Sequence, residues 1–462
     1  MSNAAAAITK APEPTVRRRR TSADPLVVEL DGVLVRGNLL LELIIKWLKR
    51  PTLSVLLLPL WALRGRGILA RELARHVEPD CSSLALDQSV LAHLKTERAH
   101  GRRLYLVTDA PTSWADKIAG ELGLFDGVLE HGAMELADDG AGESRSQRDG
   151  GEALDGTPQL RREPGGKTWS IPSLTVYLRA MRVHQWLKNI LLFVPLTAAL
   201  HFTDVTAVLH LCVAFLAFGL CASSVYLLND LADLDDDRRH PTKRERPFAS
   251  GELPISHGLV LIPGLLIASV LLSLTLPGWF AVSLAAYYAM TLAYTFALKR
   301  REAIDVVVLA LLYTTRIFAG GAVTEIYLSV WLLTFSTFIF LSLALAKRCA
   351  ELFQIRAAGG AATSGRGYLV ADLPVLFGMG IGSSYVGALV LALYLVSPQV
   401  QLAYSHPRLL WVLVPALIYW ATRLWLKTGR GEMDEDPVVF TARDPVSLGV
   451  VGACGVAIWL AM

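Results

Sequence analysis

Three aspartates and an asparagine with the spacing NDxxDxxxD follow a long apolar run. They are Asn229, Asp230, Asp233 and Asp237. On a continuous helix, which turns by about 100° per residue, the three aspartates fall within about 60° of one another. Carboxylates held this close repel each other, and a hard divalent cation relieves the repulsion. Because Mg²⁺ held by few protein oxygens shares its other positions with phosphate, the spacing predicts a metal–phosphate site with these four residues as ligands.

A run of basic side chains follows on the same loop. Lys243, Arg244 and Arg246 would meet the phosphate charge that the metal leaves uncompensated. The alternative is a solvated loop whose arginines only set membrane topology. That alternative explains the basic residues but not the aspartates, because acidic residues contribute little to topology.

The composition places this site at a membrane. Of the 462 residues, 53% are hydrophobic, and the mean hydropathy of +0.43 is too high for an ordinary soluble protein. Nine apolar segments each approach the ~20 residues that cross the hydrocarbon layer. They cover 187–203, 205–228, 254–276, 278–297, 303–323, 327–346, 374–397, 408–426 and 446–462. We therefore expect a mostly α fold, with nine transmembrane helices in a bacterial inner or plasma membrane.

The basic residues alternate between the loops. The loops after the second, fourth, sixth and eighth segments carry sixteen lysines and arginines, whereas those after the first, third, fifth and seventh carry one, Arg408. The positive-inside rule assigns the basic loops to the cytoplasm. The N-terminal region is then cytoplasmic, and the C-terminus lies outside.

The sequence divides into four parts by composition. Residues 1–23 end in a basic run and are expected to be disordered, and residues 24–131 alternate apolar runs with turn residues. Residues 132–172 are rich in Gly, Glu, Asp, Arg and Ser, which is typical of a flexible linker. Residues 173–462 contain the apolar segments.

The membrane part resembles the UbiA superfamily of intramembrane prenyltransferases. The resemblance rests on NDxxDxxxD, the following HPTKRERPFASG and the nine apolar segments. It implies a helical bundle with a lipid-accessible cavity, in which Mg²⁺ bridges the aspartates to the phosphate of a polyprenyl substrate. The implied metal ligands are Asn229, Asp230, Asp233 and Asp237.

The chain departs from this family at the second acidic motif, DxxxD. The matching loop reads ALAKRCAELFQIR and offers Lys347, Arg348 and Glu351, without paired aspartates. The loop after the fourth segment offers only Glu302 and Asp305. The usual ionisation of a prenyl diphosphate by two metal ions is therefore not expected.

Three stretches instead resemble one branch of the superfamily, the decaprenyl-phosphate phosphoribosyltransferases. They are AMRVHQWLKNILLFVPL, HPTKRERPFASG and LALAKRCAEL. The resemblance implies a lipid phosphate as acceptor and phosphoribosyl diphosphate as donor, with basic residues on the phosphates. Candidates for phosphate binding are Lys188, Asn189, Lys243, Arg244, Arg246 and Lys347.

Two alternatives to this activity remain. One is transfer of a polyprenyl group from its diphosphate to an aromatic acceptor such as 4-hydroxybenzoate. The other is a transporter, but the odd number of segments and the single acidic cluster argue against the inverted repeats of that class. The partners are membrane lipids and a small phosphorylated or aromatic co-substrate. No nucleic-acid partner is expected, and the oligomeric state is undetermined.

Four further residues are candidates for the site. Asp305 and Arg316 lie eleven residues apart, or about 16 Å along a helix, and share a helix face that we expect to line the cavity. An ionisable residue near the bilayer centre is a functional candidate, although Arg316 could instead bind backbone carbonyls or a neighbouring helix. Tyr294 and Lys299 resemble the YxxxxK element of the family, with Lys299 a phosphate ligand or a residue that sets topology.

The region before the linker predicts a small α/β domain. PLVVELDGVLVRGNLL and GRRLYLVTDAP read as strands, and strand–helix–strand order favours a parallel sheet. The pattern resembles the haloacid-dehalogenase superfamily, with Thr108 as its second motif and residues 39–100 as a helical cap. Glu29 occupies the nucleophile position, beside an intact Asp31. Because in-line attack on phosphorus tolerates little misplacement, we expect a degenerate domain used for docking or regulation rather than an active phosphatase.

Overall fold

The computed structural model describes residues 25–48, 58–81, 84–130, 159–160, 172–199, 201, 203–240, 242–363, 366–433 and 436–462. The chain forms two compact units. The α/β unit comprises Met1–Ser173 and Leu234–Ile255, and the helical unit comprises Leu174–Asp233 and Ser256–Met462. The expected N-terminal tail lies outside the described residues, as does most of the expected linker.

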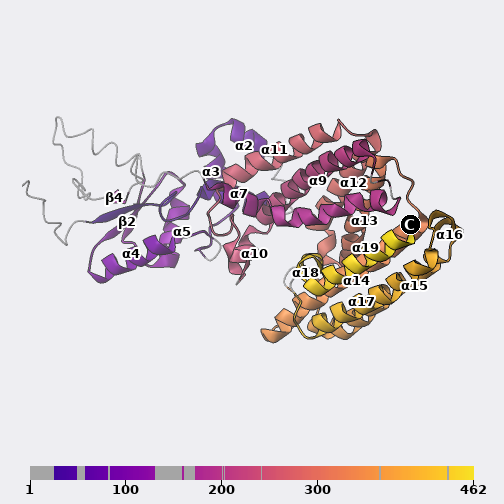
Figure 1. Cartoon of the computed structure of the whole chain (residues 1–462). Coiled ribbons are helices and arrows are strands. Elements are labelled where there is room, and N and C mark those ends of the chain that lie inside the picture. The colour runs from indigo at the N-terminus through magenta and orange to yellow at the C-terminus, as the bar shows by residue number, and fades with distance from the viewer. Residues whose placement is uncertain are drawn as a thin grey trace, which may run out of the picture. The chain divides into compact units, whose positions relative to one another are not determined.

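The α/β unit contains the expected parallel sheet (Figure 1). Its strand order is β3-β2-β1-β4. The strands are β1 Leu26–Glu29, β2 Leu104–Thr108, β3 Gly127–Glu130 and β4 Gln159–Leu160. The two central strands are apolar runs, as expected for strands covered on both faces. Glu29 is opposite Val107, so β1 and β2 end at the same edge of the sheet.

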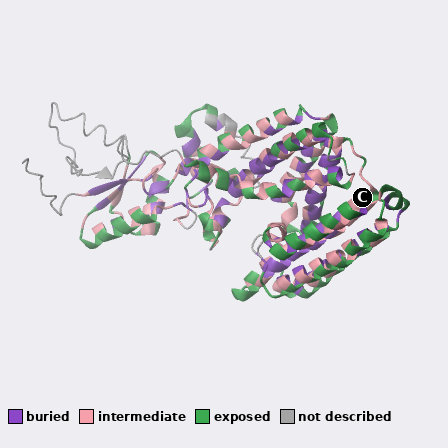
Figure 2. Ribbon diagram, viewed as in Figure 1, coloured by how far each residue is buried: buried purple, intermediate pink, exposed green. Residues whose placement is uncertain are grey.

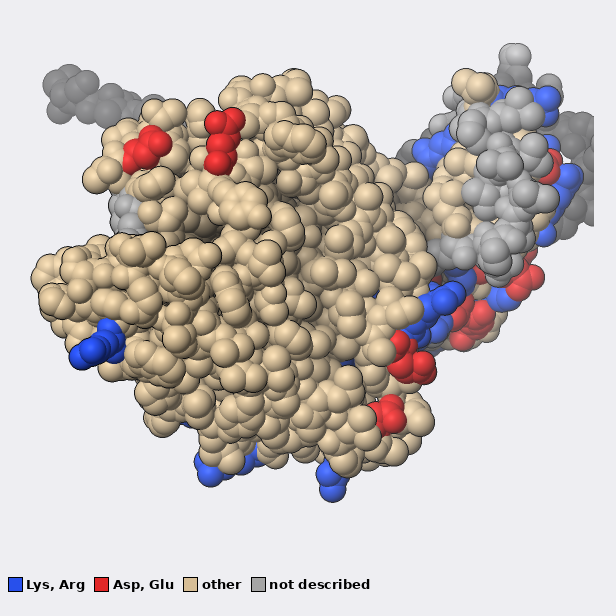
Figure 3. Space-filling view, turned by 90° about the vertical axis from the view of Figure 1, so that its right-hand side faces the viewer, with Lys and Arg blue, Asp and Glu red and all other residues tan. Residues whose placement is uncertain are grey.

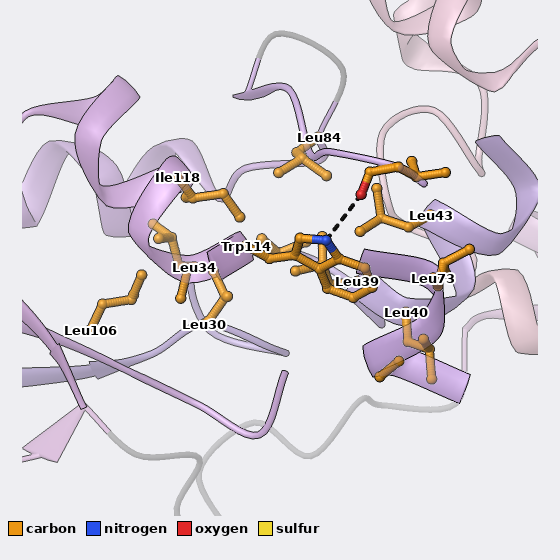
Figure 4. Packing of buried hydrophobic residues seen from close by; sticks show 14 of the residues in the cluster. Leu30, Leu34, Leu39, Leu40, Leu43, Leu73, Leu84, Leu106, Trp114 and Ile118 are labelled. Atoms are coloured by element: carbon orange, nitrogen blue, oxygen red, sulfur yellow. Dashed lines mark hydrogen bonds between the residues drawn. The ribbon is translucent and has the colours of Figure 1, made fainter. Parts of the chain in front are cut away.

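Helices complete this unit around one apolar core. They are α1 Leu39–Leu48, α2 Leu58–Leu63, α3 Arg66–Ala74, α4 Gln88–Ala99, α5 Thr112–Leu122 and α10 Leu234–Arg239, with a 3-10 helix η5 Lys243–Glu245. Leucines from the sheet, the turns and the helices surround the indole of Trp114 (Figure 4). Its Nε1 donates to the carbonyl of Val77 at 3.0 Å, so the buried polar atom of the ring is satisfied.

The helical unit consists almost entirely of helices (Figure 1). The α-helices are α7 Leu174–Ala180, α8 Val194–Ala198, α9 Val205–Ala232, α11 Ile255–Ser273, α12 Gly278–Phe296, α13 Ile304–Thr324, α14 Val330–Ala357, α15 Leu373–Leu395, α16 Pro398–Ala403, α17 Leu413–Gly429, α18 Pro437–Arg443 and α19 Pro445–Ala461. The 3-10 helices are η4 Val183–Phe193, η6 Leu298–Arg300, η7 Val370–Asp372 and η8 Pro407–Val412.

The helical unit has the surface of a membrane protein. Exposed apolar side chains such as Val260, Trp279 and Trp459 cover its outside, while buried residues line the helix contacts (Figure 2). The face seen in Figure 3 is nearly free of charged side chains. Large apolar surfaces of this kind require an apolar environment. This is an integral membrane protein.

The expectation of nine spans is not confirmed. Among the described residues, six helices are long and apolar enough to cross a membrane, or seven if the bent pair α18–α19 is one span. The expected span at 187–203 is instead η4 followed by the short α8, because Pro195 near the start of α8 lacks an amide hydrogen and interrupts the helix. Helix α12 occupies the expected span at 278–297, but its tyrosines, threonines and serine lower its hydropathy.

One expectation about the acidic cluster is wrong. The three aspartates were placed on one continuous helix, but α9 ends at Ala232, with Asp233 as its C-cap, and α10 begins at Leu234. The helix macrodipole accounts for the break. Further aspartates would be unfavourable at the negative C-terminus of α9, whereas Asp235, Asp236 and Asp237 are favoured in the first turn of α10.

Candidate active site

The last turn of α9 presents two carboxylates of the predicted cluster, and each has a basic partner. Asp230 is buried and pairs with Arg182, which caps η4 in a left-handed conformation. Both oxygens of Asp233 accept from Nζ of Lys299, at 2.8 and 2.9 Å. Asn229 is half-buried, and its carbonyl accepts from the amide of Asp233. The lysine of the YxxxxK element thus contacts the acidic cluster directly.

Asp305 has a different environment, because a buried arginine neutralises it. Nε and Nη2 of Arg348 donate to the two oxygens of Asp305 at 2.5 and 3.2 Å, and both side chains are fully buried. Tyr294 donates to the same carboxylate at 2.8 Å. Arg348 also pairs with Glu351, which a second arginine, Arg366, contacts. Asp305 is therefore held in a structural ion pair.

Two lysines from separate elements converge on one aspartate. Lys188, in η4, is buried and pairs with Asp436, and Nζ of Lys347, in α14, lies 3.9 Å from the same carboxylate oxygen. Burial acts to raise the pKa of Asp436, but the two lysine charges outweigh it and hold that pKa below its ordinary value. This arrangement places two cations around one anionic group, as a phosphate would require.

Asn189 and Arg316 meet beneath these lysines. Arg316 donates to Oδ1 of Asn189 and to the hydroxyl of Tyr287, each at 3.1 Å, and to the carbonyl of Leu312 at 2.6 Å. Its guanidinium also lies over the rings of Tyr287 and Tyr313. These contacts match the alternative in which Arg316 binds a carbonyl and neighbouring helices.

Asn189 retains one unused donor. Its side chain is 1% exposed, and Nδ2 finds no hydrogen-bond partner within the described parts of the chain. A buried donor without a partner costs about 1–3 kcal/mol, so a ligand oxygen beside Lys188 would suit this amide. Helix η4 can approach α13 closely at Gly320, where a Cβ atom would strike the carbonyl oxygen of Leu192.

The remaining predicted phosphate ligands belong to the α/β unit. They lie on the segment Leu234–Ile255, the basic loop, together with Asp237. Arg246 donates to Asp237 at 2.6 Å, while Lys243 is half-buried and Arg244 is exposed.

The donor chemistry of the acidic cluster fits magnesium. Asp230 and Asp233 offer carboxylate oxygens, which Mg²⁺ prefers. Among the described residues, no group of three or more acidic, histidine or cysteine side chains is already gathered around a metal position. The basic partners Arg182 and Lys299 supply the positive charge that a cation would bring, so these carboxylates could exchange one counter-charge for another.

The three residues of the phosphatase-like motifs lie at the carboxyl ends of the strands and have structural contacts. Oδ1 of Asp31 accepts from the amide of Leu39 at 2.9 Å at the start of α1. The hydroxyl of Thr108 accepts from the amide of Ala110 at 2.9 Å. Glu29 ends β1. The likeness to haloacid dehalogenases is not confirmed.

Sequence reasoning missed two residues of the site. Arg182 was not distinguished from other basic residues near the membrane entry, and only its contact with Asp230 identifies it. Asp436 precedes Pro437 and accepts from the amide of Val438 at 3.1 Å. The Asp-Pro pair is a recognisable helix-start signal, but it gives no hint of the two lysines.

Comparisons with known proteins agree with the membrane part of this description. The profile of the UbiA prenyltransferase family matches residues 190–442. The chain is 35% identical over 457 residues to "Uncharacterized protein y4nM" of Sinorhizobium fredii, covering 92% of this chain and 88% of that protein.

Two further proteins match over part of the chain. Decaprenyl-phosphate phosphoribosyltransferase of Mycolicibacterium smegmatis is 39% identical over 181 residues, which cover 38% of this chain and 56% of that protein. A solved structure of a UbiA homolog from Archaeoglobus fulgidus, bound to GPP and Mg²⁺, aligns with a TM-score of 0.48 and 15% identity, covering 61% of this chain and 99% of that one.

Proposed function

Since this chain belongs to the UbiA prenyltransferase family and is a membrane transferase, we propose that it transfers 5-phosphoribosyl from phosphoribosyl diphosphate to decaprenyl phosphate. The basic loops, and with them the reaction, lie on the cytoplasmic side in this proposal. The C-terminus lies outside.

The buried pair of Asp305 and Arg348 is the observation that carries the proposal. A prenyl diphosphate is usually ionised between two acidic motifs, but here Arg348 occupies both oxygens of Asp305. One acidic cluster remains, which suits a single diphosphate leaving group. The partial identity to a named decaprenyl-phosphate phosphoribosyltransferase supports the same donor and acceptor.

The site residues then have separate roles. Asp230 and Asp233 would hold Mg²⁺, with Asn229 and Asp237 added from the sequence motif alone. Bound Mg²⁺ supplies neutralisation of the leaving diphosphate. Lys188, Asn189 and Lys347 hold the phosphate of a substrate, with Asp436 as the group that this phosphate displaces. Lys299 and Arg182, once released from the aspartates, face the same anions, as do Lys243, Arg244 and Arg246.

The reaction itself needs no group that forms a bond to the protein. The bond between the ribose anomeric carbon and the diphosphate breaks, and the diphosphate leaves with the electron pair. An oxygen of the lipid phosphate forms the new bond to the same carbon. The protein contributes positioning and fixed positive charge, which are effective in a site with little water.

Transfer of label tests the proposal directly. Purified full-length protein with Mg²⁺ is given ribose-labelled phosphoribosyl diphosphate and decaprenyl phosphate, and a parallel reaction contains geranyl diphosphate and 4-hydroxybenzoate. We expect a labelled lipid phosphodiester in the first reaction and no prenylated aromatic in the second. Product only in the second reaction would replace this proposal with aromatic prenylation.

Substitution of Lys188 is expected to weaken phosphate binding. A hydrogen bond to a charged group contributes about 1.5–3 kcal/mol, so Lys188→Met should lower kcat/KM by about 10- to 100-fold. Asp436→Asn should instead lower KM, because it removes the anion that competes for both lysines. Steady-state kinetics would check both, with Lys427→Met, which removes the surface partner of Glu432, as the control. Equal effects of the two lysine variants would contradict the assignment.

A further inference from the structure

The basic loop is held by the α/β domain through a buried ion pair. Nη1 and Nη2 of Arg238, in α10, donate to the two carboxylate oxygens of Glu42, in α1, at 3.0 and 2.9 Å. The side chains are 6% and 5% exposed. Arg238 also donates through Nε to the carbonyl of Ala249, at 3.3 Å, on the returning part of the loop. One guanidinium therefore joins α1 to both ends of the loop.

The position of Glu42 is unusual for a glutamate. It lies in the sequence LLLELIIKWL, on the face of α1 that also buries Leu39, Leu43 and Trp47. Burial raises the pKa of Glu42, and the charge of Arg238 opposes that shift. Because an unpaired buried carboxylate is very costly, a glutamate on this face requires its arginine partner.

A glycine provides a second contact between the loop and the domain. Gly251 has φ +75°, and a Cβ atom added there would lie 2.9 Å from Cβ and 3.3 Å from the carbonyl oxygen of Arg36. Arg36 follows β1 and lies just before α1. The backbone of the basic loop therefore lies directly against the domain, at a place where only glycine fits without strain.

The phosphatase-like residues support this same contact. Asp31 caps the first turn of α1 through the amide of Leu39, and Asn38 accepts from the amide of Leu41 at 3.2 Å. Side-chain caps of this kind fix the start of a helix. The carboxylate of Asp31 thus positions the helix that carries Glu42.

We propose that the α/β domain is a clamp for the basic loop, and that Glu42 is a positioning residue that acts through Arg238. The loop carries Asp237, Lys243, Arg244 and Arg246, so fixing it presents these charged groups in a defined arrangement to a phosphorylated substrate. The catalytic consequence rests on the proposed function, whereas the clamp itself does not.

Hydrogen exchange of the full-length protein in lipid nanodiscs tests the clamp without any substrate. In Glu42→Ala, amides of the basic loop should exchange at least about tenfold faster, because loops that lose buried contacts open more often. Amides of α13 should be unchanged. Gly251→Ala should give the same result by a different route. The control is Asp80→Ala, which removes an exposed partner of Arg239 and should leave exchange unchanged.

A charge exchange and kinetics complete the test. Glu42→Arg combined with Arg238→Glu should restore much of the protection, which loss of packing alone would not predict. In the transferase assay, Glu42→Ala should raise KM for phosphoribosyl diphosphate by about tenfold, with a smaller change in kcat. Unchanged exchange in both Glu42→Ala and Gly251→Ala would overturn the clamp. A wild-type protein without transferase activity would refute the proposed function, while the exchange data would still decide the clamp.

Discussion

Asp233→Asn is expected to lower the rate of phosphoribosyl transfer by at least about a hundredfold, the usual loss when a group that stabilises developing charge is removed. Asp233 caps α9, its two oxygens face one lysine, and its side chain is 30% exposed, so a ligand can reach it. The amide of asparagine fits the same space but lacks the charge that holds a divalent cation. The measurement is the initial rate of labelled lipid formation at saturating Mg²⁺.

The control for this prediction is Asp236→Asn. Asp236 lies three residues further along the same acidic segment, but it is exposed and outside the NDxxDxxxD spacing. It should retain activity within about twofold, because surface substitutions away from such features have small effects. If the two variants retained the same activity, the metal assignment of Asp233 would be wrong. A parallel titration with Mn²⁺, followed by electron paramagnetic resonance, should show weaker binding only for Asp233→Asn.

Arg348→Leu is expected to destabilise the protein by about 3–5 kcal/mol, because it leaves the buried carboxylate of Asp305 without its partner. Both side chains of this pair have no exposed surface, so water cannot replace the arginine. The measurement is the free energy of unfolding in detergent micelles, from titration with a denaturing detergent. Arg356→Leu is the matched control, because Arg356 is exposed in the last turn of the same helix.

A double variant separates a structural pair from a catalytic one. Asp305→Leu combined with Arg348→Leu removes both buried charges, and such replacements are often neutral or stabilising. We expect the double variant to be more stable than Arg348→Leu. If Arg348→Leu unfolded normally but had lost all activity, Asp305 would have a direct role in the reaction instead of a structural one.

The sequence predicted the helical class and the position of the acidic cluster well. Apolar length and composition suffice to identify helices such as Val205–Ala232 and Ile304–Thr324, because no other structure satisfies the backbone in lipid. The parallel strands of the N-terminal domain followed from apolar runs bounded by turn residues. The break at Asp233 was not predicted, although the charge pattern around α10 is consistent with the macrodipole.

The ion-pair partners could not be predicted from sequence. Arg348 and Asp305 are 43 residues apart, and Lys188 and Asp436 are 248 apart, so only the packing of the helices brings them together. Arg316 had two possible environments, and the choice depended on Asn189 and Tyr287, which come from other elements. The same holds for Glu42, whose partner belongs to a loop of the membrane part.

The central claim is that the carboxylates at the end of α9 hold the donor diphosphate through a divalent cation. An experimental structure of the full chain with Mg²⁺ and phosphoribosyl diphosphate, without acceptor lipid, tests it most directly. The account predicts metal density on Asp230 and Asp233, with the diphosphate beside it and with Lys299 moved from Asp233 to a phosphate oxygen. A structure in which the donor binds elsewhere, while Arg182 and Lys299 keep their present partners, would contradict it.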